Sequence, residues 1–230
     1  MYGRRRGHPL RARQARLLAD ALPRLSLTEE AARADPLRAF PGPVEELWLE
    51  VGFGGGEHAL ALAEAHPRAG LVASEVFDNG VCSLLSRVVP EGEEATSAPP
   101  ANLLLWTRDA RHLLALLPGG ALSRLFLMFP DPWPKARHAK RRFVHPATLP
   151  LVARALRPGG EWRVATDDPT YQAWVAEVLG DPAQRLFRLG AVSDARPEGW
   201  PATRYEAKAH REGRSPRYWT WIRTEATAAA

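Results

Sequence analysis

Short apolar runs alternate with helically spaced segments along most of the chain. Runs of apolar residues predict β-strands at 47–51, 71–75, 103–106, 125–129 and 162–165. Ala and Leu recur with helical spacing at 57–65, 81–88, 111–117 and 150–156, which predicts helices there. Buried parallel strands are apolar throughout, and right-handed crossovers place helices on both faces of their sheet. The pattern therefore predicts an α/β fold with a doubly wound, mostly parallel sheet.

Four other segments complete the predicted organisation. Residues 1–35 are interpreted as a basic, Arg-rich N-terminal arm that is partly disordered, and 36–230 as the folded domain. The proline-rich stretch 36–43 predicts a linker between them. The polar stretch 90–100 is predicted to be a surface excursion. The aromatic run 218–222 alternates in character, which predicts a late antiparallel strand at an edge of the sheet.

Positive charge is concentrated in two places. The formal net charge is +5 and the pI about 9.9, which favours a polyanionic partner such as nucleic acid. The first 16 residues contain no acid and six arginines: Arg4, Arg5, Arg6, Arg11, Arg13 and Arg16. The second group is predicted to bind RNA and comprises Lys135, Arg137, Lys140, Arg141 and Arg142. His138 either contacts RNA with them or stabilises the local structure.

Composition limits the cellular compartments and the kinds of chemistry that suit this chain. Cys82 is the single cysteine, so it cannot form an internal disulfide or a metal cluster, and we expect a buried side chain there. Trp219 and Trp221 are also expected in the core. The chain has no run of 18 apolar residues and no secretory h-region. These features predict a cytoplasmic protein without a metal.

Carboxylates and glycines follow the predicted strands at the edge where ligands bind in parallel sheets. Glu50 begins a glycine-rich turn that contains Gly52 and Gly54, where a backbone can approach a ligand closely. Glu75 ends the second strand and is placed to accept hydrogen bonds from ribose hydroxyls. Asp109 follows the third strand and suits an adenine amine. The set predicts a nucleoside cofactor with an amino-acid tail, as in S-adenosylmethionine.

The segment after the fourth strand reads Pro130-Asp131-Pro132-Trp133-Pro134-Lys135-Ala136-Arg137-His138. Three prolines restrict the backbone around one carboxylate, one aromatic ring and one ammonium. A ring beside an acid can stack on a base while the acid hydrogen-bonds its edge. The segment therefore predicts a rigid site for a nucleic-acid base.

This segment resembles the tRNA guanine-N7 methyltransferase family, in which Pro-Asp-Pro-Trp-Pro-Lys-x-Arg-His is diagnostic. The order of motifs from about Trp48 to Ile222 is similar too, including Leu49-Glu50-Val51-Gly52-Phe53-Gly54, Ser74-Glu75-Val76, Asp109-Ala110, Ala165-Thr166-Asp167 and Thr203-Arg204-Tyr205-Glu206. Residues Phe77-Asp78-Asn79 and the stretch 90–100 depart from the family. The resemblance implies a Rossmann-like class I methyltransferase fold over 36–230.

The same resemblance implies an activity and roles for the residues. The reaction would be methyl transfer from S-adenosyl-L-methionine to N7 of guanine 46 in the tRNA variable loop. The cofactor would contact Glu50, Gly52, Gly54, Glu75, Asp109 and Asp131, and Asp131 would be catalytic. The substrate would contact Lys135, Asp167, Thr203, Arg204, Tyr205 and Glu206. Guanine N7 already has a lone pair, so we expect Asp131 to orient and stabilise charge more than to remove a proton. A monomer and a homodimer both remain open.

Three other readings compete with this one. Amino methyltransferases of DNA carry two adjacent prolines before the aromatic ring, whereas Pro132 here separates Asp131 from Trp133. Nicotinamide dehydrogenases use a different glycine spacing. A non-catalytic RNA-binding protein on the same scaffold would be expected to have lost Glu50, Glu75 or Asp131, and this chain has all three.

Overall fold

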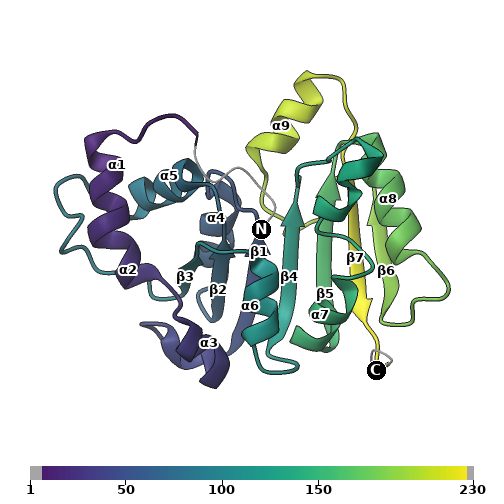
Figure 1. Cartoon of the computed structure of the whole chain (residues 1–230), viewed down its shortest axis with the longest axis horizontal. Helices are drawn as coiled ribbons and strands as arrows, with labels where there is room; N and C mark the ends of the chain where they lie inside the picture. Colours follow the sequence, from purple (N-terminus) through teal and green to yellow (C-terminus); the bar gives the residue numbers. More distant parts are fainter. Residues whose placement is uncertain (1–6, 227–230) are drawn as a thin grey trace. The chain divides into compact units, whose positions relative to one another are not determined.

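The computed structural model describes residues 7–226. The chain divides into two compact units, 1–118 and 119–230. Each unit has its own strands and helices, drawn from purple to yellow in chain order (Figure 1).

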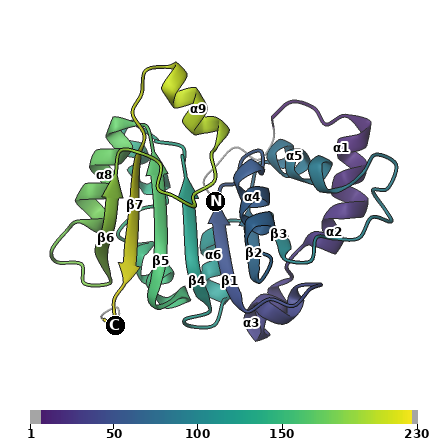
Figure 2. The ribbon, with the colours of Figure 1, turned by 180° about the vertical axis from the view of Figure 1, so that it is seen from behind.

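The first unit contains three parallel strands in the order β3-β2-β1: β1 Glu46–Val51, β2 Ala69–Ser74 and β3 Leu103–Trp106. Helices follow each strand: α4 Glu57–Ala65, α5 Asp78–Val88 and α6 Ala110–Leu116. Opposite views show α4 on one face of these strands (Figure 2) and α6 on the other (Figure 1). The strands are buried, as their unbroken apolar sequences require; Leu49, Leu71 and Leu105 are fully inaccessible.

The N-terminal residues described here pack as helices against this unit. They form α1 Ala12–Arg16, a π-helical turn η1 Leu17–Ala21, α2 Leu22–Leu25, α3 Glu29–Ala34 and a 3-10 turn η2 Pro36–Ala39. Leu17, Ala21 and Leu25 are buried, and the Leu27 amide donates to the Leu105 carbonyl at 3.0 Å. Figure 2 shows α1 and α2 beside α5 and β3.

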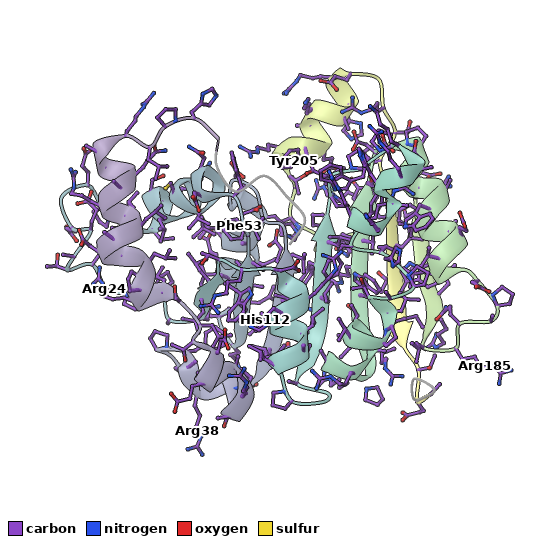
Figure 3. All side chains as sticks on the ribbon, in the orientation of Figure 1. Arg24, Arg38, Phe53, His112, Arg185 and Tyr205 are labelled. Atoms are coloured by element: carbon purple, nitrogen blue, oxygen red, sulfur yellow. The ribbon has the colours of Figure 1, made fainter. Side chains whose placement is uncertain are left out.

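Part of the basic arm is neutralised within the protein. Glu94, from the stretch 90–100, is buried and lies 3.3 Å from Arg13 and 3.5 Å from Arg16. Arg24, marked on α2 in Figure 3, donates to the Glu94 and Ser97 carbonyls at 2.6 and 2.7 Å. Most of 91–97 is exposed. The arm as a unit of 1–35 stays a prediction, and its Arg4, Arg5 and Arg6 lie outside the described residues.

The second unit contains four strands in the order β4-β5-β7-β6: β4 Leu122–Met128, β5 Leu156–Thr166, β6 Phe187–Ser193 and β7 Arg217–Arg223. Strands β4 and β5 are parallel, whereas β7 is antiparallel to both β5 and β6. Its helical segments are η3 Ala136–Arg141, α7 Leu149–Ala155, α8 Pro169–Leu179 and α9 Arg204–Arg211. Figure 1 shows α9 beyond the carboxyl ends of β4 and β5.

The predicted fold class is confirmed, with mostly parallel strands and an antiparallel late strand. The prediction that 218–222 forms an edge strand was wrong, because β7 pairs with β5 on one side and β6 on the other. This position explains the burial of Trp219 and Trp221, which was predicted. Cys82 is buried as expected, and burial raises the pKa of its thiol to about 11. In residues 7–226 no helix is long and apolar enough to cross a membrane.

Candidate cofactor and substrate sites

A glycine-rich turn connects β1 to α4 in the first unit. Gly52, Gly54 and Gly56 have φ angles of +75°, +60° and +86°, which glycine adopts without the steric cost that a Cβ imposes. The Gly52 amide donates to the Ser74 carbonyl at 2.8 Å, so the turn is tied to the end of β2. A Cβ at Gly52 would meet no atom within 4 Å. The turn is therefore shaped by its own sequence and has open space at Gly52.

Glu75 fastens this turn to the next loop. One carboxylate oxygen accepts a hydrogen bond from the Gly54 amide at 3.0 Å. The other accepts from the Val76 and Phe77 amides at 2.7 and 3.0 Å. These backbone amides hold the carboxylate in place at the end of β2, between the glycine-rich turn and the start of α5. The predicted ribose contact remains compatible with this geometry.

Glu50, at the end of β1, is almost fully buried. Its Oε2 lies 3.1 Å from His58 Nδ1 on α4, and both side chains are at most 4% exposed. Burial favours an effect of Glu50 through its charge and through the shape of the turn over a direct contact with a large ligand. His58 was not identified from the sequence, because a lone histidine in a helix has no spacing that marks it as a partner.

Asp109 caps the helix that follows β3. Its side chain accepts from the Arg111 amide at 2.9 Å, and its backbone carbonyl accepts from Trp106 Nε1 at 3.2 Å. The side chain is about a fifth exposed. Capping fixes the carboxylate at the carboxyl end of a parallel strand, where the adenine contact is predicted. The first unit thus brings Glu50, Gly52, Gly54 and Glu75 into one connected cluster and holds Asp109 in the corresponding place after β3.

The proline-rich segment after β4 in the second unit has an unusual backbone. Phe129 and Trp133 have φ angles of +51° and +44°, a region that bulky residues rarely occupy. The Phe129 amide donates to the Ala165 carbonyl at 2.7 Å, which ties the start of the segment to β5. Asp131 lies between these two positions and is exposed. We refer to residues 129–135 as the substrate loop.

The basic group that follows this loop is not uniform. Lys135, Arg137 and Lys140 are exposed, as RNA contact requires. The Arg141 guanidinium lies 4.6 Å from the centre of the Trp133 ring. Arg142 is buried and donates to the carbonyls of Pro132 and Trp133, both at 3.1 Å. RNA binding by this group stays a prediction, and its members differ in what they touch within the protein.

His138 lies among these cations, with its ring 5.7 Å from that of Trp133 in an edge-to-face arrangement. Partial burial lowers the pKa of His138, and so do the positive charges of Arg141 and Arg137, and more weakly Lys135 and Lys140. The lowered pKa favours the neutral imidazole, whose ring lies against that of Trp133. Both predicted roles of His138 stay open.

The remaining predicted substrate residues lie near the carboxyl end of β5 and on α9. Asp167 pairs with Arg214, which donates to it at 2.5 Å, and this bond raises the pKa of Arg214. Thr203 caps α9 by accepting from the Glu206 amide at 3.0 Å. Tyr205 projects from α9 (Figure 3) and is 38% exposed, with the Arg204 guanidinium 4.9 Å from its ring.

Glu206 differs from its neighbours because it is buried. Its Oε1 lies 3.1 Å from Arg196 Nε. Burial and then the charge of Glu206 raise the pKa of Tyr218 on β7. Arg196 also donates to the Trp200 carbonyl at 2.7 Å. Glu206 thus anchors α9 to the rest of the second unit, and only the exposed side chains of this helix present a surface for a substrate.

Comparisons with known proteins first define the class. Solved structures with this fold include the 16S rRNA methyltransferase KamB, with a TM-score of 0.56 at 17% identity over 79% of this chain and 89% of that one. A 16S rRNA (adenine(1408)-N(1))-methyltransferase variant from Catenulisporales acidiphilia has a TM-score of 0.57 at 12% identity, over 88% and 95%. At these identities the likeness shows the fold, which is that of class I methyltransferases.

Sequence comparisons define the family within that class. Residues 45–217 match the model of a family described as putative methyltransferase. A tRNA (guanine-N(7)-)-methyltransferase of Granulibacter bethesdensis is 60% identical over 97% of this chain and 94% of its own length. Its counterpart of Rhodospirillum rubrum is 50% identical over 94% and 85%. The chain belongs to the tRNA (guanine-N7-)-methyltransferase family, as the resemblance predicted.

Proposed function

We propose that the protein transfers a methyl group from S-adenosyl-L-methionine to N7 of guanine in tRNA, at position 46 of the variable loop. The observation that carries this proposal is the substrate loop after β4. Its three prolines and the left-handed backbone of Trp133 hold Asp131 in an exposed position. It occurs in a chain whose relatives with 50–60% identity bear the name of that activity. Action in the cytoplasm, where tRNA is modified, is part of the proposal.

The cofactor role rests on the first unit. The Gly52 turn and the Glu75 carboxylate suit a nucleoside with an amino-acid tail, because the turn leaves open space at Gly52 and backbone amides hold the carboxylate beside the turn. Asp109, held by its capping bond, would accept from the adenine amine. S-adenosylmethionine supplies an electrophilic methyl on a sulfonium sulfur.

The substrate role rests on the second unit and needs no strong base. The N7 lone pair of guanine forms the new bond to carbon as the sulfur–carbon bond breaks, and the sulfonium charge passes to the purine. Asp131 would align the base by accepting from N1-H and N2-H, and its negative charge would stabilise the purine as it becomes cationic. Lys135 and the exposed arginine of the basic group would hold the adjacent phosphates.

Transfer of labelled methyl to unmodified tRNA, with mass-spectrometric identification of the product nucleoside, tests the proposal. We expect 7-methylguanosine in the variable loop. Asp131→Ala should lower kcat about a hundredfold or more, by analogy with the loss of one electrostatic partner of a transition state. Asp131→Asn should lose less, because an amide keeps a hydrogen bond to the base edge.

Glu177→Ala is the matched control, since it removes an exposed acid from α8 in the same unit. It should leave the rate unchanged. A methyl group on another atom would refute the assignment of N7. A rate for Asp131→Ala equal to that of Glu177→Ala would refute the role of Asp131.

A further inference from the structure

Arg142 stands apart from the other cations of its sequence group. Its exposure is 5%, whereas Arg137 and Lys140 are exposed. Lys and Arg are almost never fully buried unless they are paired. A buried guanidinium in a group whose other cations are exposed or partly exposed therefore points to a role inside the protein.

The contacts of Arg142 define that role. Its Nε donates to the Pro132 carbonyl and its Nη2 to the Trp133 carbonyl, each at 3.1 Å. The guanidinium also lies 4.7 Å from the centre of the Trp174 ring on α8. Trp174 is fixed in turn, because its Nε1 donates to the Val144 carbonyl at 2.6 Å. Arg142 thus joins two consecutive carbonyls of the substrate loop to a rigid helix.

The carbonyls that Arg142 holds flank the strained part of the loop. Trp133 has a φ of +44°, and such a conformation persists in a bulky residue only where the surroundings determine it. Pro132 has no amide proton, so the backbone here cannot be tied down through a hydrogen bond from that residue. Hydrogen bonds from an ionised donor are stronger than neutral ones, which suits Arg142 to this task.

We propose that Arg142 is a positioning residue that locks the substrate loop, so that Asp131 and the Trp133 ring are held ready for the base, and that it does not bind tRNA phosphates. The inference rests on the proposed function for its effect on methyl transfer. Its structural part, the locking of the loop, stands without substrate or cofactor. It replaces the RNA-binding role that the sequence predicted for this one arginine.

The most informative variant is Arg142→Lys, which keeps the positive charge of the side chain. A lysine ammonium is a point charge on a flexible stem, and it cannot donate along two fixed directions while lying flat on an indole ring. If Arg142 locked nothing and only attracted phosphate, this change would be almost silent. If it locks the loop, kcat should fall about tenfold to a hundredfold, since small misplacements of reacting groups have effects of that size.

The first readout needs no activity. The protein is labelled with 5-fluorotryptophan, and Trp133→Phe identifies the fluorine signal of Trp133. We expect one sharp Trp133 signal in the parent chain without ligands. In Arg142→Lys this signal should broaden or split, while the signal of the buried Trp162 stays unchanged and shows that the unit is folded.

The second readout is the salt dependence of tRNA binding. Each phosphate contact contributes roughly 0.7 to 0.9 to the slope of log K against log salt. Arg142→Gln should keep the parent slope, whereas Arg137→Gln, at an exposed position of the same group, should flatten it. Trp174→Phe gives a second way to weaken the lock if Arg142→Gln folds poorly, and it should broaden the Trp133 signal with no change in slope.

The outcomes separate the two proposals. A sharp Trp133 signal in both Arg142→Lys and Trp174→Phe, or a flattened slope for Arg142→Gln like that of Arg137→Gln, overturns the locking role. Broadening of the Trp133 signal in a protein that transfers no methyl to guanine N7 supports the lock and refutes the proposed function instead.

Discussion

The glycine turn after β1 and the substrate loop after β4 use the same backbone conformation in opposite ways. In the turn, the left-handed angles fall on Gly52, Gly54 and Gly56, where they cost little. In the loop, they fall on Phe129 and Trp133, where a left-handed conformation costs about 1–2 kcal/mol per residue. The first shape is permitted by its own sequence, whereas the second is imposed by the surrounding protein.

The two regions also differ in what holds them. A carboxylate, Glu75, binds the amide of Gly54 in the turn. A guanidinium, Arg142, binds two carbonyls in the loop. Since a strained loop persists only with such support, its geometry depends on distant residues. The glycine turn needs little such support, but Gly80 packs closely against Gly54, so the largest effects there should come from added atoms.

The largest expected effect is on the glycine turn and follows from Gly80→Ala. A Cβ at Gly80 would lie 2.4 Å from the Gly54 carbonyl oxygen, so the turn or the start of α5 must move. Overpacking typically costs about 1–3 kcal/mol, which corresponds to about a fivefold to 150-fold loss of cofactor affinity if the turn takes the strain. Calorimetric titration with S-adenosylmethionine measures it.

Gly92→Ala is the matched control in the same unit. Its φ is +88° and a Cβ there would meet nothing within 4 Å, so it imposes backbone strain without a clash. It should lower the free energy of unfolding by about 1–2 kcal/mol and leave cofactor affinity unchanged. Equal affinities for the two variants would show that close packing does not shape the turn.

The contrast also explains which features the sequence could predict. Glycines, strands and the acids that follow the strands are local signals, so the turn and its residues were found. The contacts by which Arg142 holds the substrate loop were not predicted. Arg142 is ten residues from Pro132, and its second partner, Trp174, comes from α8. No spacing in the sequence relates them. The density of arginines beside it favoured an RNA contact instead.

Two other features of the fold were not predicted, for the same physical reason. Strand β6 is almost entirely exposed after Phe187, so it lacks the alternation that would have revealed it and shown that β7 is interior. In the N-terminal region, Leu17, Ala21 and Leu25 are buried at helical spacing, a signal that was present but was outweighed by the arginines. In both cases the structure depends on tertiary contacts between segments that are distant in the sequence.

A smaller effect is expected at the strained position itself. Glycine adopts the φ of Trp133 freely. The free energy of unfolding of Trp133→Gly should therefore be about 1 kcal/mol higher than that of Trp133→Ala. At Val192 on the exposed strand β6 the order should reverse, with glycine about 0.5–1 kcal/mol less stable than alanine. Chemical denaturation of the four variants measures both differences. The same order at both positions would mean that Trp133 is not strained.

The smallest expected effect is electrostatic and concerns His138 in the loop's basic surroundings. Burial and the charges of Arg141, Arg137, Lys135 and Lys140 lower its pKa, so its NMR titration midpoint should lie below 6.5. As the pH falls below about 6.5, the unfolded chain takes up this proton before the folded one does. The stability cost of His138 is therefore absent well above pH 6.5 and grows as the pH falls toward the pKa of the folded state. Below that pKa the cost stays constant.

Two comparisons sharpen this expectation. His138→Gln should lose less stability than the parent between pH 7 and pH 5. Bound tRNA places phosphates near the exposed cations of the group, so it should move the His138 midpoint upward if those cations contact RNA. If the titration midpoint of His138 does not change when tRNA binds, His138 supports the Trp133 ring. Only a histidine shielded from the phosphates would keep its pKa.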